Sequence, residues 1–178
     1  MIRPHLALLR GINVGGNNPV PMAELRDAFG DMGFTDVATY IQSGNVLFRG
    51  AKVDENAIQA RLSEQFSYHG RVVVLSGAAY RKNLAAAPPA WGHDDTRKHN
   101  ALFTLAGMKP QEVLSRLPPL SEFEEVATGP GVIFWSAPKD KYTKTMFARK
   151  LVGHPMYKEL TIRNQNTTFK LAKLLDEM

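Results

Sequence analysis

The stretch VATYIQSGNVLF (residues 37–48) decides the fold, because it joins two short β-forming runs through a tight-turn signal. Residues 37–41 and 46–48 are rich in β-branched and aromatic side chains, which favour strands. Between them, Gly44 supplies the positive φ that a tight hairpin turn requires. We therefore expect these two strands to pair antiparallel.

Helical patterns flank the hairpin on both sides. Apolar side chains recur at helical spacing over residues 22–32, directly after Pro21, a residue that favours helix starts. Asp54 is a typical N-cap for a second helix, whose apolar positions lie within residues 58–66. Two apolar runs complete the series as strands, at residues 6–9 and 71–75. The first half is therefore predicted to have the order β-α-β-β-α-β.

The same order recurs after a linking stretch with a short helix. These further elements are expected at residues 101–105, from Pro110, at 122–127, at 132–135, from Thr143, at 159–163, and from an N-cap at Asn166. The predicted fold class is α+β, a duplicated ferredoxin-like fold (β-α-β-β-α-β twice) with antiparallel sheets and an extra C-terminal helix. The predicted boundaries are 1–76 for the first half, 77–98 for the linker, and 99–178 for the second half with the C-terminal helix.

The composition excludes several classes of site and location. The chain has 178 residues and no cysteine, so disulfides, thiolate metal sites and cysteine nucleophiles are excluded. The apolar run at residues 6–9 is too short for a secretion signal or a membrane span, so we expect a cytoplasmic protein without a membrane partner. The net charge of +5 is uneven, since residues 139–150 are basic and residues 121–127 are acidic, and we expect both charge runs to form solvated faces.

The first candidate site lies at one end of the first sheet, where the topology places the loop RGINVGGNNPVP (residues 10–21) beside the hairpin turn. We expect a small anionic metabolite or a nucleotide-like ligand there, with Arg10 supplying charge and other side chains supplying orientation. The predicted ligand-binding residues are Arg10, Asn13, Gly15, Gly16, Asn17, Gln42, Ser43 and Asn45, with Tyr68 and His69 at the same end. Alternatively, the glycines and asparagines only supply the positive φ values of a strand-to-helix turn. Phosphate binding by the loop backbone is disfavoured, because Pro19 and Pro21 lack N–H donors and no phosphate-loop motif is present.

A second polar cluster is expected at the lower end of the second sheet. It comprises Lys139, Lys141, Lys144, Arg163, Asn164 and Asn166. The alternative function is nucleic-acid binding through this basic half. Phe103, Phe134 and Trp135 lie on strands that an RNA-binding sheet would use, but the matching motif is missing, so we expect these rings in the core.

Other chemistry has little support in the sequence. The five histidines are scattered without metal-ligand spacing, and we expect no metal and no cofactor. Ser43 lacks the flanking glycines of a nucleophile elbow, so whether the protein is an enzyme stays open. The oligomeric state is not indicated by any pattern.

Three stretches resemble a known family. LLRGINVGGNNPVPMAELR (residues 8–26) and GFTDVATYIQSGNVLF (residues 33–48) resemble the bacterial domain of unknown function 1697, and TIRNQNTTFKLAKL (residues 161–174) is similar to its C-terminal signature. The resemblance implies a duplicated ferredoxin-like fold and no established activity. The chain departs from the family pattern at Gln165, where a tryptophan is usual, and at residues 143–145, where Thr-Lys-Thr replaces Ser-Lys-Leu.

Overall fold

The computed structural model describes residues 1–13, 19–67, 70–105 and 107–178, and these form two compact units. Unit 1 comprises Met1–Tyr80 and Leu171–Met178, and unit 2 comprises Arg81–Lys170. The second predicted half contains the whole C-terminal helix, whereas in the structure the end of this helix groups with unit 1. The expected linker is partly structured, because a helix follows the first half without a break.

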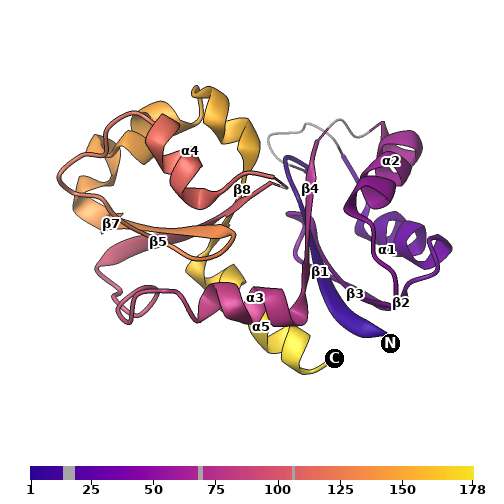
Figure 1. Cartoon of the computed structure of the whole chain (residues 1–178). Helices are drawn as coiled ribbons and strands as arrows, with labels where there is room; N and C mark the ends of the chain where they lie inside the picture. The colour runs from indigo at the N-terminus through magenta and orange to yellow at the C-terminus, as the bar shows by residue number, and fades with distance from the viewer. Residues whose placement is uncertain (14–18, 68–69, 106) are drawn as a thin grey trace. The chain divides into compact units, whose positions relative to one another are not determined.

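Unit 1 contains the predicted β-α-β-β-α-β series (Figure 1). Its elements are β1 (Arg3–Leu9), α1 (Met22–Asp31), β2 (Thr35–Tyr40), β3 (Asn45–Gly50), α2 (Glu55–Phe66) and β4 (Val72–Ser76), followed by α3 (Gly77–Leu84). The sheet is antiparallel with the order β2-β3-β1-β4, so the first and third strands lie in the centre.

The hairpin turn requires glycine at position 44. Gly44 has φ +76°, and a Cβ atom there would lie 2.8 Å from the Cβ of Leu9. The carbonyl of Gly44 also accepts a hydrogen bond of 2.8 Å from the backbone N–H of Leu9. The turn is therefore in close contact with the end of β1, as the sequence predicts for a hairpin beside that strand.

Two helices cover one face of the first sheet. Leu25 and Phe29 of α1 and Leu62 of α2 pack in one buried cluster with Phe48 of β3. The rings of Phe29 and Phe48 lie 5.1 Å apart. The predicted N-cap of α2 is confirmed, because Asp54 accepts hydrogen bonds from the backbone N–H groups at positions 56 and 57.

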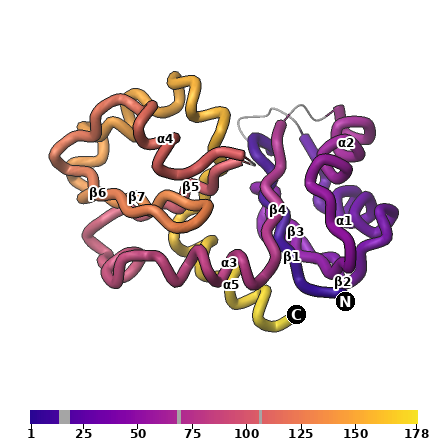
Figure 2. The backbone as a smooth tube through the Cα atoms, in the orientation of Figure 1, coloured from indigo at the N-terminus to yellow at the C-terminus, as the bar shows by residue number. Residues whose placement is uncertain are grey.

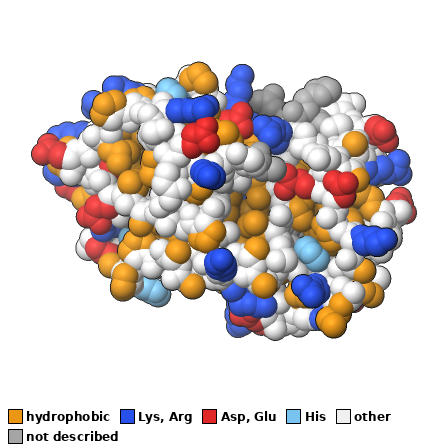
Figure 3. All heavy atoms as spheres, viewed as in Figure 1, with side chains coloured by type: hydrophobic (Ala, Val, Ile, Leu, Met, Phe, Trp, Pro, Cys, Tyr) orange, Lys and Arg blue, Asp and Glu red, His pale blue; other side chains and the backbone are white. Residues whose placement is uncertain are grey.

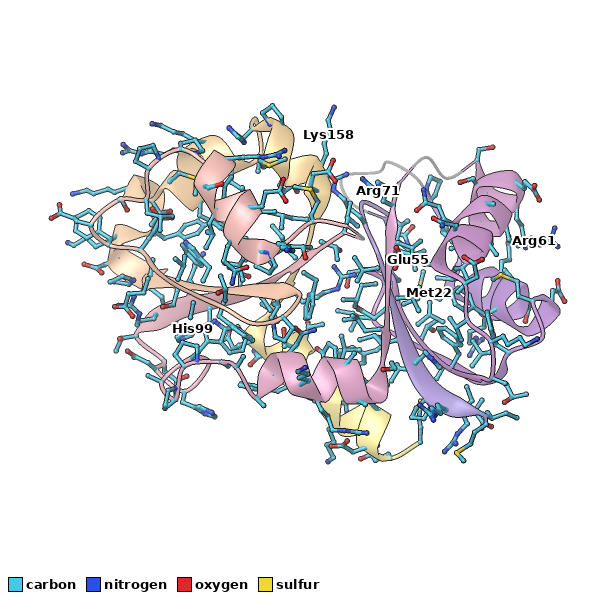
Figure 4. The ribbon with its side chains drawn as sticks, viewed as in Figure 1. Met22, Glu55, Arg61, Arg71, His99 and Lys158 are labelled. Atoms are coloured by element: carbon cyan, nitrogen blue, oxygen red, sulfur yellow. The ribbon has the colours of Figure 1, made fainter. Side chains whose placement is uncertain are left out.

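Side chains of α2 cover the outer edge of β4. Glu55 Oε2 accepts a hydrogen bond of 2.7 Å from the N–H of Val74, and Gln59 Oε1 accepts one of 3.3 Å from the N–H of Val72. Figure 4 shows Glu55 beside this strand. Since an edge strand with unpaired N–H groups can pair with another chain, these contacts protect the edge of the sheet.

Unit 2 repeats the strand order of unit 1. Its elements are β5 (Arg97–Thr104), α4 (Pro110–Arg116), β6 (Glu125–Thr128), β7 (Val132–Pro138), three short helical segments η1 (Lys139–Lys144), η2 (Phe147–Leu151) and η3 (Pro155–Glu159), β8 (Leu160–Asn164) and the start of α5 (Gln165–Asp176). The antiparallel order β6-β7-β5-β8 matches β2-β3-β1-β4. The chain therefore has the predicted duplicated ferredoxin-like α+β fold with an additional C-terminal helix.

Several local predictions for unit 2 are wrong. The single helix expected from Thr143 is replaced by a 3₁₀ helix and a π-type turn, followed by a second 3₁₀ helix. Strand β5 begins at residue 97 rather than 101, and β6 begins at residue 125 rather than 122. The N-cap of α5 is Asn164 and not Asn166, because Asn164 Oδ1 accepts a hydrogen bond of 2.9 Å from the N–H of Thr167.

Both faces of the second sheet are covered. On one face, Trp135 packs in a buried cluster with side chains of α4 and of η1 to η3, and Figure 2 shows these segments on the same side of the sheet. On the other face, the Trp91 ring contacts Phe134 at 4.9 Å and Phe169 at 5.6 Å. Phe103, Phe134 and Trp135 are buried as predicted, so their rings do not offer a platform for stacking nucleic-acid bases.

A buried carboxylate joins the loop before β6 to the start of η2. Glu124 is 9% exposed and accepts hydrogen bonds from Ser121 N at 2.8 Å, Ser121 Oγ at 2.9 Å and Trp135 Nε1 at 2.9 Å. It also accepts hydrogen bonds from the N–H groups of Met146 at 2.8 Å and Phe147 at 3.0 Å. The expectation that the acidic run is a solvated face is therefore wrong at this position, where the carboxylate caps a helical turn.

Thr145 completes this cap. Its Oγ1 accepts a hydrogen bond of 3.1 Å from the N–H of Ala148 and donates one of 2.7 Å to the carbonyl of Tyr142. Three consecutive N–H groups at the start of η2 therefore have side-chain acceptors, one from Thr145 and two from Glu124. The hydroxyl at position 145 is thus engaged in holding the backbone.

The environment of Glu124 favours the ionised carboxylate. Burial raises the pKa of the Glu124 carboxyl, but the hydrogen bonds from Ser121, Phe147, Trp135 and Met146 outweigh burial and hold the pKa below its ordinary value. Such a group stabilises the fold above the ordinary glutamate pKa. Its contribution is lost as the pH falls through the lowered pKa of the folded state.

We expect Glu124→Gln to lower the free energy of unfolding by about 3 kcal/mol at neutral pH, because an amide leaves some of these donors without an acceptor. The difference from the wild type should shrink as the pH falls below the ordinary glutamate pKa of about 4.3 and through the lowered pKa of the folded state, where the wild-type carboxyl is also protonated. Urea unfolding at a series of pH values measures both effects. Glu122→Gln, at an exposed position in the same acidic run, is the matched control and should change little. Equal effects of the two variants would contradict the capping role.

Candidate functional site

The structure brings the two loops of the first candidate site together. Asn13 Oδ1 accepts a hydrogen bond of 2.8 Å from the N–H of Val20, and its Nδ2 donates to the carbonyls of Val20 at 3.0 Å and Gln42 at 3.1 Å. Asn13 has φ +52°, a conformation that asparagine tolerates better than most residues. Its amide therefore ties the loop after β1 to the hairpin turn.

Asn45 has a similar role within the hairpin. Its side chain is fully buried, and Nδ2 donates to the carbonyl of Tyr40 at 2.9 Å and to Ser43 Oγ at 3.1 Å. Arg10 follows β1, and its backbone N–H donates a hydrogen bond of 2.9 Å to the carbonyl of Arg71. The remaining residues of this candidate site, Gly15, Gly16, Asn17, Tyr68 and His69, lie outside the described residues.

Three residues of the second polar cluster line one cavity of about 550 Å³. These are Lys139, Asn164 and Asn166. The cavity lies within unit 2, on the face of the second sheet that η1 to η3 cover. A cavity of this volume is large enough for a metabolite.

The other three residues of the cluster lie elsewhere. Arg163 is buried, and the strand register places it on the opposite face of the sheet, where its Nη1 donates a hydrogen bond of 3.0 Å to Thr161 Oγ1. Lys141 Nζ lies 2.9 Å from Asp140 Oδ2 in an exposed ion pair. Lys144 is exposed on η1 and does not line the cavity.

Strand β5 contributes its first four residues to the cavity lining, Arg97 to Asn100, and among them Lys98 and Asn100 share one face of the strand. Because side chains alternate along a strand, both point to the same face as Leu102. In the register, Asn100 is the partner of Trp135 on one neighbouring strand and of Asn164 on the other. Asn100 therefore lies on the floor of the cavity, between an aromatic residue and a second amide.

Aromatic rings form a wall of the cavity. Tyr142 and Phe147 both line it, and the Phe147 ring is stacked on Trp135 with centroids 4.3 Å apart. Lys98 Nζ lies 3.8 Å from the centroid of the Tyr142 ring, a cation–π contact that positions the ammonium group. Tyr157 of η3 also lines the cavity.

The electrostatic character of the cavity favours an anion. Lys139 lies next to the start of β5, since its backbone N–H donates a hydrogen bond of 3.0 Å to the carbonyl of Thr96. The first turn of α5 contributes Gln165 and Asn166, where the helix dipole adds partial positive charge. Among the described residues that line the cavity, none is Asp or Glu. The site therefore combines two ammonium groups with amide donors and acceptors.

Sequence reasoning missed Lys98, Asn100, Tyr142 and Gln165 as site residues. A signal for the first two was present, because residues 98, 100 and 102 alternate in RKHNALF (residues 97–103) as one face of a strand does. Lys98 lies in the predicted linker, and Asn100 lies directly before the strand expected at residues 101–105. Gln165, one of the departures from the family pattern, lines the cavity, and Thr145, another departure, caps η2.

The described part of the chain has neither a membrane-spanning helix nor a cluster of metal-binding side chains. No helix there is both long and apolar enough to cross a membrane. No three His, Asp or Glu side chains gather there as a metal-binding group would.

Comparisons with known proteins place the chain in a family. The model of the family described as "Protein of unknown function (DUF1697)" matches residues 2–134. The fold is similar to that of the conserved bacterial protein SP0830 from Streptococcus pneumoniae, with a TM-score of 0.88, 29% sequence identity, and 98% of this chain and 99% of that chain covered. Protein BT0572 from Bacteroides thetaiotaomicron aligns over 96% of this chain and 97% of its own, but 11% identity and a TM-score of 0.24 carry no weight for the fold. The curated proteins contain no significant match. Because the family model covers most of the chain, the protein belongs to the DUF1697 family of proteins of unknown function.

Proposed function

We propose that this protein binds a small anionic ligand in the cavity of unit 2. The proposal rests on one observation: Lys98, Lys139 and the first residues of α5 line the same cavity, and the described lining of this cavity contains no acidic residue. An anion there would contact two cations and the positive end of a helix. We also propose a cytoplasmic location, which fractionation of cells would test.

The sequence also predicts an anionic ligand, but at the end of the first sheet. The side-chain contacts in the structure favour the cavity of unit 2 as its binding site. In the first candidate site, Asn13 and Asn45 use their amides to hold the backbone of two loops. In the cavity, the Lys98 and Lys139 ammonium groups are not in any ion pair within the described residues. Ligand binding at the end of the first sheet stays a prediction, which the same experiment tests.

We expect Lys98→Met with Lys139→Met to weaken binding of phosphorylated metabolites at least about tenfold, which corresponds to about 1.4 kcal/mol. Methionine keeps the apolar stem of lysine and removes the charge. A thermal-shift screen of sugar phosphates and nucleotides identifies the ligands, since a ligand at one hundred times its Kd stabilises the fold by about 2.7 kcal/mol. Calorimetry on the variant then measures the loss.

The matched control removes the same charge outside the cavity. Lys144→Met with Lys150→Met changes two exposed lysines that do not line it, and the affinity should stay within about twofold if only long-range charge is lost. Equal losses in the two double variants would show that net charge alone binds the ligand. If Gln42→Ala with Arg10→Met weakens binding and the cavity variant does not, the ligand lies at the first sheet.

Nucleic-acid binding through the basic half remains the alternative. On the face shown in Figure 3, Lys and Arg side chains are interspersed with Asp and Glu, which does not favour a long continuous phosphate track. If RNA or single-stranded DNA is the ligand, log affinity should fall steeply with log salt, and Ala at positions 139, 141 and 144 should flatten the slope. For the small-ligand proposal we expect no nucleic-acid binding at about 150 mM salt, measured by fluorescence anisotropy.

A further inference from the structure

We propose that Asn100 determines the specificity of the unit 2 cavity, and that the ligand is a nucleoside monophosphate whose base Asn100 recognises. This inference rests on the proposed function, because it identifies the class of the anionic ligand. It begins from the position of Asn100 in the sheet. Asn100 is on β5, a central strand, and its neighbours on the same face include the buried Leu102 and Trp135.

The side chain of Asn100 has no hydrogen-bond partner among the described residues, although it is half-buried. Four other asparagines of the described chain, Asn13, Asn45, Asn83 and Asn164, use their side chains to hold the backbone. Asn83 Oδ1 accepts a hydrogen bond of 2.8 Å from the N–H of Gly131, and Asn164 Oδ1 caps α5. The neighbours of Asn100 on this face are two apolar side chains, Leu102 and Trp135, and two polar ones, Lys98 and Asn164. The amide of Asn100 is therefore available to a ligand in the cavity.

The chemistry of an amide fits the edge of a nucleobase. Its carbonyl accepts and its NH₂ donates side by side, which matches the adjacent donor and acceptor atoms that every base carries. The rings of Tyr142 and Phe147 line the same cavity and can pack against a planar base. A sugar phosphate or inorganic phosphate has no planar base that the Asn100 amide and these two rings could contact.

The distance along β5 fits the length of a nucleotide. Lys98 and Asn100 are two residues apart on the same face, which separates them by about 6.6 Å. A base at Asn100 would thus place a phosphate within reach of Lys98, and Lys139 lies at the same end of the cavity. The cavity volume of about 550 Å³ accommodates a nucleoside monophosphate.

The test compares AMP, GMP, CMP and UMP with ribose 5-phosphate by calorimetry. We expect at least one nucleotide to bind at least about tenfold tighter than ribose 5-phosphate, because only the nucleotide reaches Asn100. Asn100→Leu, which keeps the volume and removes the amide, should abolish this advantage and leave the affinity for ribose 5-phosphate unchanged. Asn56→Leu, at an exposed position on α2, is the control and should change neither affinity.

Each outcome separates this inference from the proposed function. If all four nucleotides bind no tighter than ribose 5-phosphate, or if Asn100→Leu weakens both ligands equally, the role of Asn100 is overturned and anion binding stands. If no phosphorylated ligand responds to the Lys98 and Lys139 variants, the proposed function itself fails. Thermal unfolding controls for folding, and we expect Asn100→Leu to melt close to the wild type, because no described residue loses a hydrogen-bond partner.

Discussion

The candidate site depends on the hydrogen bonds that the carboxylate of Glu124 accepts. This carboxylate satisfies backbone N–H groups at the start of η2 and holds the indole of Trp135 at the same time. Phe147, whose N–H it accepts, stacks on that indole and lines the cavity. One ionised side chain therefore fixes both the cap of a short helical segment and the aromatic wall of the cavity. A segment as short as η2 has too few internal hydrogen bonds to be stable without such contacts.

Unit 1 uses polar side chains in the same way. Glu55 satisfies an N–H group at the edge of β4, Asp54 caps α2, and Asn13 and Asn45 hold two loops. In each case a backbone group gains a side-chain partner in place of water, and all of these contacts except the Asp54 cap are partly buried. This use of side chains explains why polar residues at a loop are weak indicators of a ligand site. Lys98 and Asn100 are different, because they line a cavity and do not hold the backbone.

Much of the fold could be predicted because its signals are local. The turn at Gly44, the N-cap at Asp54 and the helical spacing over residues 22–32 each depend on neighbours a few positions away. Of the second polar cluster predicted from the sequence, Lys139, Asn164 and Asn166 line one cavity, whereas Arg163 lies on the opposite face of the sheet. Lys98 and Asn100 were not predicted as site residues, because β5 begins at residue 97 and the predicted strand begins at residue 101. Residues that lie before the expected strand are assigned to neither face of the sheet, so their side chains could not be placed.

The sequence by itself determined the order of the elements, the hairpins and therefore the strand order of both sheets. The physical reason is that periodicity, turns and caps act over short stretches of chain, and antiparallel pairing then leaves few topologies. Only the tertiary structure decided the form of residues 139–159 and the cavity beneath them. That segment takes its conformation from Glu124, a partner more than 20 residues away, and from packing on Trp135. Contacts between residues far apart in the chain leave no local sequence pattern. The cavity, and the position of Asn100 on its floor, could therefore be seen only in the folded structure.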